Sequence, residues 1–311
     1  MAVFFFALTM GVPKFEHSMA TAKSLLKACK DKIVQTITER SFEATYNKTF
    51  ELIEAGTGEL KGRAYRLRHK VYCEEHGVEC PEEEGSYIER DEFDERAVSF
   101  LLKHKVSHEC AGTLRVVLPN DECPGDSFPM QKLCDHPLLR FDSRALKLCE
   151  ISRFCMAPRF RKRENDGKFL SAYSDQDIRK VHDNGKVKFI RRSIPYAQAA
   201  LLRGAFETAM QAQILDCIWM VEPAHLDSLQ KIGFPYRILG PQLDIHGGMQ
   251  PVIFNIKHVL DTMHREAPHC WAVVSDGGRL QDMADEVSRT NWQDDLMDDA
   301  CKDMLYGQLL D

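Results

Sequence analysis

Three strand-like segments in the middle of the chain most constrain its fold. The segments AVSFLLKHKV (97–106) and CAGTLRVVLP (110–119) are apolar and are separated by a short turn, which is typical of a β-hairpin. A third apolar segment, KLCEISRFCM (147–156), follows further along the chain. We therefore predict three strands of a sheet in this part of the protein.

The segments around these three predict helices and further strands. The spacing of apolar residues predicts helices at 58–75 and 196–214, and short apolar runs predict strands at 216–222 and 251–256. Shorter elements are expected at 50–55 (strand), 128–134 (helix), 226–234 (helix) and 236–240 (strand). This order predicts an α/β fold with a mixed sheet rather than a doubly wound parallel one. No strand is followed by a GxGxxG or GxxxxGK[ST] motif, so Rossmann and P-loop chemistry are not expected.

The chain has 311 residues, which is enough for one large α/β domain with additions. We expect the domain at 46–260, after an N-terminal helical extension at 1–45. A charged, polar stretch at 164–195 is predicted to be an insertion loop. An acidic tail is expected at 261–311, because residues 276–311 hold ten acidic and three basic residues.

The distribution of charge limits the partners that the chain can have. The formal net charge is −6, and the acidic end accounts for all of it, so the rest of the chain is about neutral. A neutral body does not favour nucleic acid as a partner, although local basic clusters could hold a small anionic ligand. The apolar start, MAVFFFALTMGV, has roughly 11 apolar residues where a bilayer span needs about 20. It is compatible with packing on the body or with peripheral contact at a membrane surface.

The chain contains 11 cysteines, an odd number without any CxxC pair. Such usage is typical of reduced thiols, so we predict a cytoplasmic location. Cys73, His76 and Cys80 lie close together as C-x2-H-x3-C, but no matching second pair of ligands lies nearby. Because a structural zinc site needs four ligands, no metal site is predicted.

The strand at 147–156 carries Glu150 and Arg153 inside an apolar run, and a cluster of cations follows it. Those cations are Arg159, Arg161, Lys162 and Arg163. One interpretation is a strand with a single ion pair and then a solvated basic loop. The other is a catalytic strand followed by an anion-binding turn. On a regular strand, positions 150 and 153 point to opposite faces, whereas a bulge between them would turn both toward one cleft.

Four motifs, in this order, resemble those of one enzyme family. They are the helix YRLRHKVYCEEHGVE with Arg68 and Tyr72, the segment ERDEFDERAVSFLL with Asp91 and Asp94, the strand AGTLRVVLP with Arg115, and the strand CEISRF with Glu150 and Arg153. The set is similar to the autoinducer-synthase-like branch of the GNAT (N-acetyltransferase) superfamily. That branch includes acyl-homoserine-lactone synthases, long-chain N-acyl amino acid synthases and exosortase-associated acyltransferases. LDSLQKIGF (226–234) and LGPQLDIHGGMQPV (239–252) add to the resemblance, which covers roughly residues 50–256.

The resemblance implies a GNAT-type α/β fold and the transfer of a long acyl chain to the amine of an amino acid or similar small molecule. The expected donor is acyl-phosphopantetheine on acyl carrier protein, or acyl-CoA, and no tightly bound cofactor is expected. The turn after the catalytic strand lacks the glycines that close around a pyrophosphate, so Arg159, Arg161, Lys162 and Arg163 are expected to dock the acyl donor. The tryptophan that lactone synthases carry after the Arg68 motif is missing, which disfavours S-adenosylmethionine as co-substrate.

Within this resemblance, Glu150 is the expected general base, because the attacking amine must lose a proton. The expected substrate-binding residues are Arg68, Tyr72, Asp91, Asp94, Arg115 and Arg153. The charged ones could equally form a scaffold for the cleft, since buried charges must be paired. We expect Arg115 to be scaffold and Arg68 or Arg153 to hold the acceptor's carboxylate. Asp91 or Asp94 would hold its amine.

The sequence leaves alternatives open at several points. Glu150 could be purely structural, as the buried partner of Arg115 or Arg153. Cys149 and Cys155 flank Glu150, but a cysteine nucleophile needs a nearby base, which spacing alone does not supply. A CoA-dependent acetyltransferase would share the fold, although the glycine-poor turn argues against it. A non-catalytic acyl- or protein-binding module would release no free thiol from any acyl donor.

Overall fold

The structure is a computed structural model that describes most of the chain between residues 44 and 294. The described residues are 44, 46–78, 87–140, 147–161, 179–183, 186–190, 194–245 and 248–294. Side chains are described within these ranges except at 179–196 and 291–294. Most of the predicted N-terminal extension and insertion, and the last residues of the predicted tail, lie outside them.

Seven strands form one mixed sheet in the order β1-β2-β3-β4-β7-β9-β8. They are β1 (Phe50–Glu54), β2 (Ala97–His104), β3 (Cys110–Val117), β4 (Leu148–Met156), β7 (Asp216–Val221), β8 (Arg237–Ile238) and β9 (Gln250–Asn255). All neighbours are antiparallel except β4 and β7, which are parallel. The predicted α/β fold with a mixed sheet is confirmed, including the β2–β3 hairpin. A separate pair, β5 (Arg179–Asp183) and β6 (Lys186–Ile190), lies within the segment predicted to be an insertion loop.

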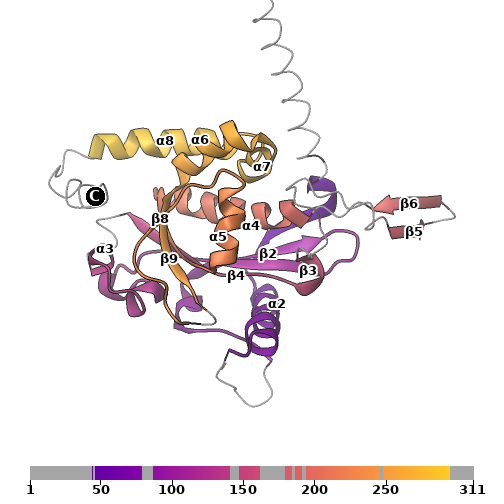
Figure 1. Ribbon diagram of the computed structural model, residues 1–311, viewed down its shortest axis with the longest axis horizontal. Helices are drawn as coiled ribbons and strands as arrows, with labels where there is room; N and C mark the ends of the chain where they lie inside the picture. Colours follow the sequence, from indigo (N-terminus) through magenta and orange to yellow (C-terminus); the bar gives the residue numbers. More distant parts are fainter. Residues whose placement is uncertain are drawn as a thin grey trace, which may run out of the picture.

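Helices cover both faces of the sheet (Figure 1). One face is covered by α2 (Gly58–His69), whose N-terminus is capped by the Thr57 hydroxyl, which accepts a hydrogen bond from the Leu60 N–H at 3.4 Å. The helix continues as the π-helix η1 (Lys70–Glu75) and is followed by Gly77 with φ of +67°. The helix predicted at 58–75 is thereby confirmed.

Short helices extend this face beside α2. They are η2 (Glu92–Glu95), η3 (Pro124–Asp126), η4 (Pro129–Lys132) and α3 (Pro137–Arg140). A small apolar core that includes Phe93, Val117, Met130 and Ile218 joins these helices to the sheet. A fifth short helix, η5 (Pro158–Phe160), directly follows β4. The segment between β3 and β4 is thus held close to the strand that carries Glu150.

The larger apolar core lies on the opposite face, under α4 (Ile194–Gln211) and α5 (Pro223–Gln230) (Figure 1). Gly204 explains how closely α4 packs on the sheet. A Cβ atom at this position would lie 2.8 Å from the Phe100 ring, closer than carbon atoms pack. Glycine therefore permits the helix backbone to approach β2.

The helices near the C-terminal end correct one prediction. The acidic composition predicts a tail from residue 261, but the chain instead folds into α6 (Ile256–Glu266), α7 (Pro268–Val274) and α8 (Arg279–Asp294). Buried positions of α6 and α8 include Val259, Leu260, Met263, Leu280, Ala284 and Val287. These apolar residues recur at helical spacing between acidic ones. The segment therefore forms amphipathic helices despite its high net charge.

The cysteines also depart from what was expected. Cys73 is disulfide-bonded, whereas the sequence predicts reduced thiols throughout. The other described cysteines are free, and they are Cys110, Cys123, Cys134, Cys149, Cys155, Cys217 and Cys270. An odd total therefore did not exclude an individual disulfide.

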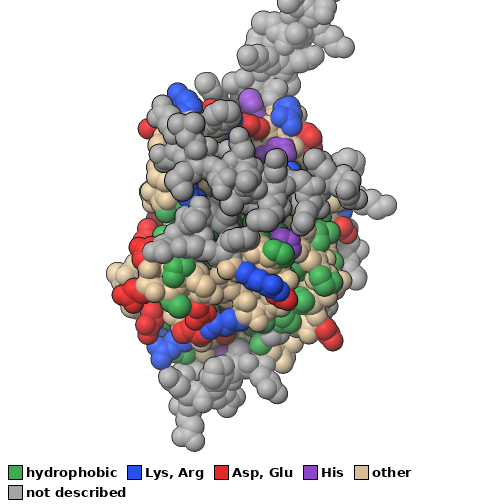
Figure 2. Space-filling view, turned by 90° about the vertical axis from the view of Figure 1, so that its left-hand side faces the viewer, with side chains coloured by type: hydrophobic (Ala, Val, Ile, Leu, Met, Phe, Trp, Pro, Cys, Tyr) green, Lys and Arg blue, Asp and Glu red, His purple; other side chains and the backbone are tan. Residues whose placement is uncertain are grey.

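The surface carries charges of both signs. On the face shown in Figure 2, Lys and Arg side chains lie scattered among acidic ones rather than gathered in one area. Among the side chains that the structure describes, the exposed large apolar ones are Tyr87, Val106, Leu133 and Ile238. Within the described part of the chain, no helix has the length and apolar character that a membrane crossing requires.

Candidate active site

A bulge in β4 shapes the face on which the site lies. Thr113 pairs with Cys155 and Arg115 with Ser152, so the register between β3 and β4 shifts by one residue at this point. The extra residue is accommodated at Arg153, whose φ of +52° is unusual for a side chain other than glycine. The bulge turns Arg153 toward the face that also carries Arg115 and Glu150. This is the distortion on which the sequence interpretation of a shared cleft depended.

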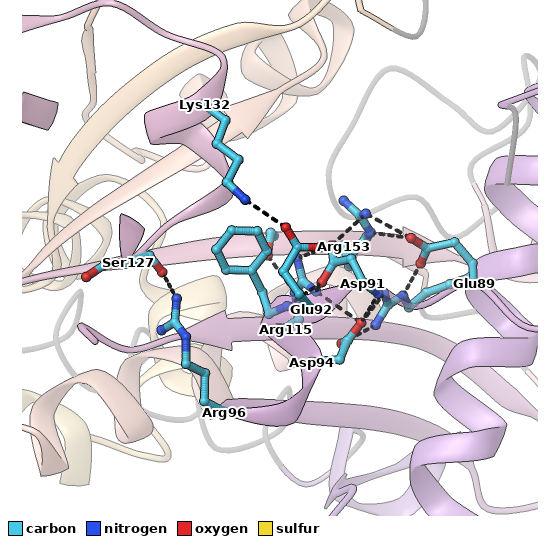
Figure 3. Close-up of polar contacts among 12 residues, drawn as sticks. Glu89, Asp91, Glu92, Asp94, Arg96, Arg115, Ser127, Lys132 and Arg153 are labelled. Carbon is cyan, nitrogen blue, oxygen red and sulfur yellow. Dashed lines mark hydrogen bonds and ion pairs between the residues drawn. The ribbon is translucent and has the colours of Figure 1, made fainter. Parts of the chain in front are cut away.

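Three guanidinium groups and three carboxylates alternate in a closed ring of ion pairs (Figure 3). In order around the ring they are Arg68, Glu89, Arg153, Asp91, Arg115 and Asp94. The N···O distances are 2.8 Å for Arg153–Glu89, 2.9 Å for Arg153–Asp91 and 3.1 Å for Arg115–Asp94. The formal charges cancel, as the cost of burying charged groups requires.

The acids of the ring are positioned by the short helix η2. The Asp91 side chain accepts a hydrogen bond from the Phe93 N–H at 3.0 Å, and the Asp94 side chain accepts one from the Asp91 N–H at 2.9 Å. This capping box holds both carboxylates at the start of η2. The D-x-x-D spacing seen in the sequence is therefore a cap that also presents two carboxylates to arginines.

Glu89 completes the ring, although the sequence reasoning did not select it. It bridges Arg68 and Arg153, and without it each of these arginines would lose one of its two carboxylate partners in the ring. The available signal was its position two residues before Asp91, since alternate residues of an extended segment face the same way. The motif resemblance directed attention to Asp91 and Asp94 alone.

The ring has a buried side and an exposed side. The side chains of Arg68 and Arg115 are each 1% exposed, whereas Arg153 is 30% and Asp91 19% exposed. Arg68 and Arg115 also use all three guanidinium nitrogens in hydrogen bonds, to Glu89 and Asp94 for Arg68 and to Asp91 and Ser152 for Arg115. A substrate that met this ring would therefore meet Arg153 and Asp91 first.

The ring holds Arg68 and Asp94 in their charged forms. Burial alone would raise the pKa of Asp94, but the hydrogen bonds and positive charge of Arg68, with the charge of Arg115, outweigh it and lower this pKa to about 2. Burial would lower the pKa of Arg68, but Asp94 and Glu89 outweigh it and the pKa rises. The Arg68–Asp94 pair is consequently ionised at neutral pH.

Glu150 lies beside the ring without belonging to it. It is 2% exposed, and its carboxylate accepts a hydrogen bond from the Met130 N–H in η4 at 2.9 Å. Burial raises its pKa to about 7, against the opposing effects of the Met130 amide, Arg115 and Arg153. Among the described ion pairs none includes Glu150, so the alternative of a buried pair with Arg115 or Arg153 is not what the structure shows. A carboxyl group that titrates near neutral pH is suited to exchange protons.

Tyr72 fastens the bulge to the neighbouring helix. Its hydroxyl donates a hydrogen bond to the Phe154 carbonyl at 3.1 Å, and the Arg153 guanidinium lies 6.0 Å from the centre of its ring. Burial raises the pKa of Tyr72, which keeps the phenol protonated. Its described contacts therefore support the backbone of β4 next to the site.

The cysteines that flank Glu150 do not resemble nucleophiles. Burial raises the pKa of Cys155 to about 12, so the reactive thiolate is scarce. The Cys149 sulfur lies 3.3 Å from the Cys217 sulfur within the larger core, on the face opposite Glu150. Neither thiol has a described base beside it.

The two described cations after β4 already have acidic partners. Arg159 lies 2.7 Å from Glu109, and Arg161 lies 2.9 Å from Glu75 and donates to the Met156 carbonyl at 2.8 Å. Lys162 and Arg163 lie outside the described residues. The basic cluster of the sequence is thus partly neutralised at its described positions.

The two central strands stop pairing just beyond Glu150. Parallel pairing of β4 and β7 runs from Leu148–Asp216 to Ile151–Trp219, although both strands continue. Beyond that point the rings of Phe154, Trp219 and His225 contact one another, with centroids 5.0 to 5.5 Å apart.

The described residues contain no group of three His, Cys, Asp or Glu side chains that could hold a metal ion. Of the pattern formed by Cys73, His76 and Cys80, the last residue lies outside the described chain.

The pairing of β4 with β7 thus ends beside the buried carboxyl group of Glu150. Residues 67–168 match the family described as "Acetyltransferase (GNAT) domain". The matched stretch contains every member of the charge ring and Glu150. This match agrees with the resemblance and with the fold class predicted from the motifs.

Three of the solved structures that this chain matches are the following. TofI, solved in a ternary complex with an inhibitor and MTA, is 18% identical, with 70% of this chain and 96% of that chain covered and a TM-score of 0.46. The CoA-dependent acyl-homoserine lactone synthase BjaI, with SAM and isopentyl-CoA, is 16% identical over 71% and 89%, with a TM-score of 0.46. FeeM, an N-acyl amino acid synthase from uncultured soil microbes, is 13% identical over 68% and 93%, with a TM-score of 0.45.

These similarities are too distant to identify the substrates of this chain. A search among curated proteins gave no sequence match. The choice of donor and acceptor therefore depends on the site itself.

Proposed function

We propose that this chain transfers a long-chain acyl group from acyl carrier protein to the amine of an amino acid or a similar small molecule. One observation carries the proposal. A buried carboxyl group, Glu150, lies beside a neutral ring that exposes one carboxylate, Asp91, and one guanidinium, Arg153. An amino acid brings one ammonium and one carboxylate, so it matches both groups and leaves the total charge of the ring unchanged.

The acceptor would bind on the exposed side of the ring. Arg153 would hold the acceptor's carboxylate, where its planar guanidinium can donate two aligned hydrogen bonds. Asp91 would hold the amine. Arg68 and Arg115 would serve as scaffold, because their nitrogens are already committed and their side chains are buried. Of the two arginines expected to contact the acceptor, this selects Arg153.

Glu150 would act as the general base. An α-amine has a pKa near 8, so most of it is protonated at neutral pH. A carboxylate with a pKa of about 7 can take that proton with little cost. An ordinary glutamate would lie several units lower, at roughly 1.4 kcal/mol per unit. Glu150 takes one proton from the ammonium and thereby frees the amine to attack. As the C–N bond forms and the C–S bond breaks, the second proton of the nitrogen passes through solvent to the departing thiolate, and Glu150 then releases its proton to solvent.

The donor would enter where β4 and β7 separate. Its phosphopantetheine phosphate, or acidic residues of the carrier, would approach the basic turn that follows β4. Arg159 and Arg161 would then exchange their partners Glu109 and Glu75 for the donor's negative charges. Such exchange is plausible energetically, because exposed ion pairs contribute only about 0–1 kcal/mol. A carrier-protein donor would place the reaction in the cytoplasm.

The direct test supplies the purified protein with three donors in parallel. They are acyl carrier protein charged with a long acyl chain, the same chain on CoA, and acetyl-CoA, each with an equimolar mixture of amino acids. Mass spectrometry should detect N-acyl amino acids from the charged carrier protein, and the Glu150→Gln variant should form far less. Turnover confined to acyl-CoA would contradict the carrier-protein donor, and turnover of all donors without an amino-acid product would contradict the acceptor.

A CoA-dependent acetyltransferase is the second candidate, and the description of the matching family favours it. It predicts consumption of acetyl-CoA in the third arm of the same experiment. The structure offers Glu150 to either reaction, so the donor series separates the two functions and variants of Glu150 do not.

A further inference from the structure

In the described structure, the carboxylate of Glu150 accepts a hydrogen bond directly from the Met130 amide. The amide lies in η4, in the connection between β3 and β4, and not on the sheet itself. A hydrogen bond of this kind depends on where the connection is held. Whatever fixes η4 relative to β4 therefore also fixes the environment of Glu150.

Arg96 fastens that connection at two points. This half-buried side chain, just before β2, donates to the Leu118 carbonyl, one residue after β3. It also donates to the Ser127 carbonyl, three residues before Met130 (Figure 3). Its guanidinium also lies 5.3 Å from the centre of the Phe93 ring in η2. One side chain thus joins the end of β3, the approach to η4 and the helix that carries the acids of the ring.

A second contact supports the same arrangement from the solvent side. Lys132 of η4 lies 2.7 Å from Glu92 of η2 and 4.8 Å from the centre of the Phe93 ring (Figure 3). This pair is exposed, so it is expected to contribute little. The half-buried Arg96, with hydrogen bonds to two separate backbone carbonyls, is the stronger of the two attachments.

We propose that Arg96 is a positioning residue, which holds the β3–β4 connection so that the Met130 amide points at Glu150 and thereby sets the pH at which Glu150 acts. The proposal rests on the proposed role of Glu150 as base. The two terminal nitrogens of the Arg96 guanidinium form a planar fork that donates to two carbonyls at once, which the single ammonium of a lysine cannot do in this geometry. Loss of the fork would free the connection and remove a hydrogen bond that favours the ionised carboxylate.

Other charges also act on Glu150. A test must separate the effect of these charges from the effect of where the Met130 amide is held. Arg115 of β3 and Arg153 of β4 favour its ionised form, whereas Asp91 disfavours it. Arg96 and Glu150 are themselves within electrostatic reach of each other. Removal of the Arg96 charge would therefore shift Glu150 in the same direction as loss of the Met130 bond. A variant that keeps the charge but loses the fork is needed.

The experiment compares Arg96→Lys, which keeps the charge, with Arg96→Met, which does not. Arg140→Met is the matched control, because Arg140 pairs with Asp135 on the surface of the same connection and contacts neither Leu118 nor Ser127 in the described structure. The readouts are the pH dependence of kcat/KM for acyl transfer and the hydrogen exchange rate of the Met130 amide.

Both Arg96 variants should move the acid limb of the profile to higher pH and keep the plateau at high pH. At pH 7 the rate should fall roughly 3- to 10-fold, since an upward shift of about one unit leaves about a tenth of Glu150 ionised. The Met130 amide should exchange at least about 10-fold faster. The control should change neither readout.

A folded Arg96→Lys protein with an unchanged acid limb and unchanged exchange of the Met130 amide would overturn the inference. A shift in Arg96→Met alone would also overturn it, because charge would then explain the effect. If the native protein transfers no acyl group, the proposed function fails, and exchange of the Met130 amide still decides whether Arg96 holds the connection.

Discussion

The Arg68 guanidinium donates to both carboxylate oxygens of Asp94, at 2.6 and 2.8 Å, and neither side chain is reached by solvent. This pair ties α2 to η2 and supports the exposed half of the charge ring from within. Because both groups are buried, the protein cannot lose one partner without leaving the other uncompensated.

The first prediction separates scaffold from acceptor contact within the ring. Arg68→Lys and Arg115→Lys should each lower the free energy of unfolding by roughly 2 kcal/mol, because a lysine cannot replace the aligned hydrogen bonds to buried carboxylates. Arg153→Lys should lower it less and should raise the acceptor's KM. Chemical denaturation and acceptor kinetics on the three variants measure both effects. Three unstable variants with an unchanged KM would show that the ring does not hold the acceptor.

The second prediction concerns the role of Glu150 in turnover. Glu150→Gln should fold and should slow acyl transfer by about 10²-fold or more at neutral pH, since general-base assistance contributes typically 10²–10⁴-fold. The native rate should fall as the pH drops through about 7, where Glu150 takes up a proton. A well-folded variant with the native rate would remove Glu150 from the mechanism.

The third prediction uses Glu150→Gln to test how burial of the Glu150 carboxylate changes stability with pH. The pKa of Glu150 is raised on folding from 4.5 to about 7, so the folded state binds more protons between these values. Stability from this group is therefore present at low pH and is lost as the pH rises through about 7. Glu150→Gln should remove that loss. The free energy of unfolding of Glu150→Gln minus that of the native protein should therefore be larger at pH 8 than at pH 5, by up to roughly 3 kcal/mol. Equal differences at both pH values would contradict the raised pKa.

The fourth prediction concerns the turn after β4. Replacement of Arg159, Arg161 and Arg163 by Ala should raise the KM for the charged carrier protein more than the KM for the acceptor. The effect should shrink as salt rises, because exposed charges are screened over about 8–10 Å at physiological ionic strength. Arg140→Ala is a control on another surface. Equal losses for both substrates, insensitive to salt, would argue against donor docking.

The fifth prediction concerns the packing of α4. Gly204→Ala should lower the free energy of unfolding by about 1–3 kcal/mol, because its Cβ would lie 2.8 Å from the Phe100 ring in a filled core. Gly56→Ala is the matched control, since no atom lies within 4 Å of a Cβ there. Thermal unfolding of both variants measures the difference. Similar stability would mean that α4 can move away from β2.

The sequence by itself predicted the seven strands of the main sheet, the helices α2, α4 and α5, and most of the charged residues at the site. Apolar alternation and spacing are local patterns, and they predicted β2, β3, β4 and α4 nearly to their observed ends. The order of the motifs predicted the family. The segment expected as an acidic tail contains packed helices, in which Leu280, Ala284 and Val287 recur at helical spacing among acidic residues.

Only the tertiary structure decided what each charge does. Glu89, Asp91 and Asp94 are equally acidic in the sequence, and none of their ring partners is a sequence neighbour. The bulge that turns Arg153 toward the ring depends on its pairing with β3. The raised pKa of Glu150 depends on burial under η4 and on the Met130 amide, 20 residues away along the chain. Electrostatic energies depend on distance and burial in three dimensions, so neither the closed ring nor the titration of Glu150 could be derived from the order of residues alone.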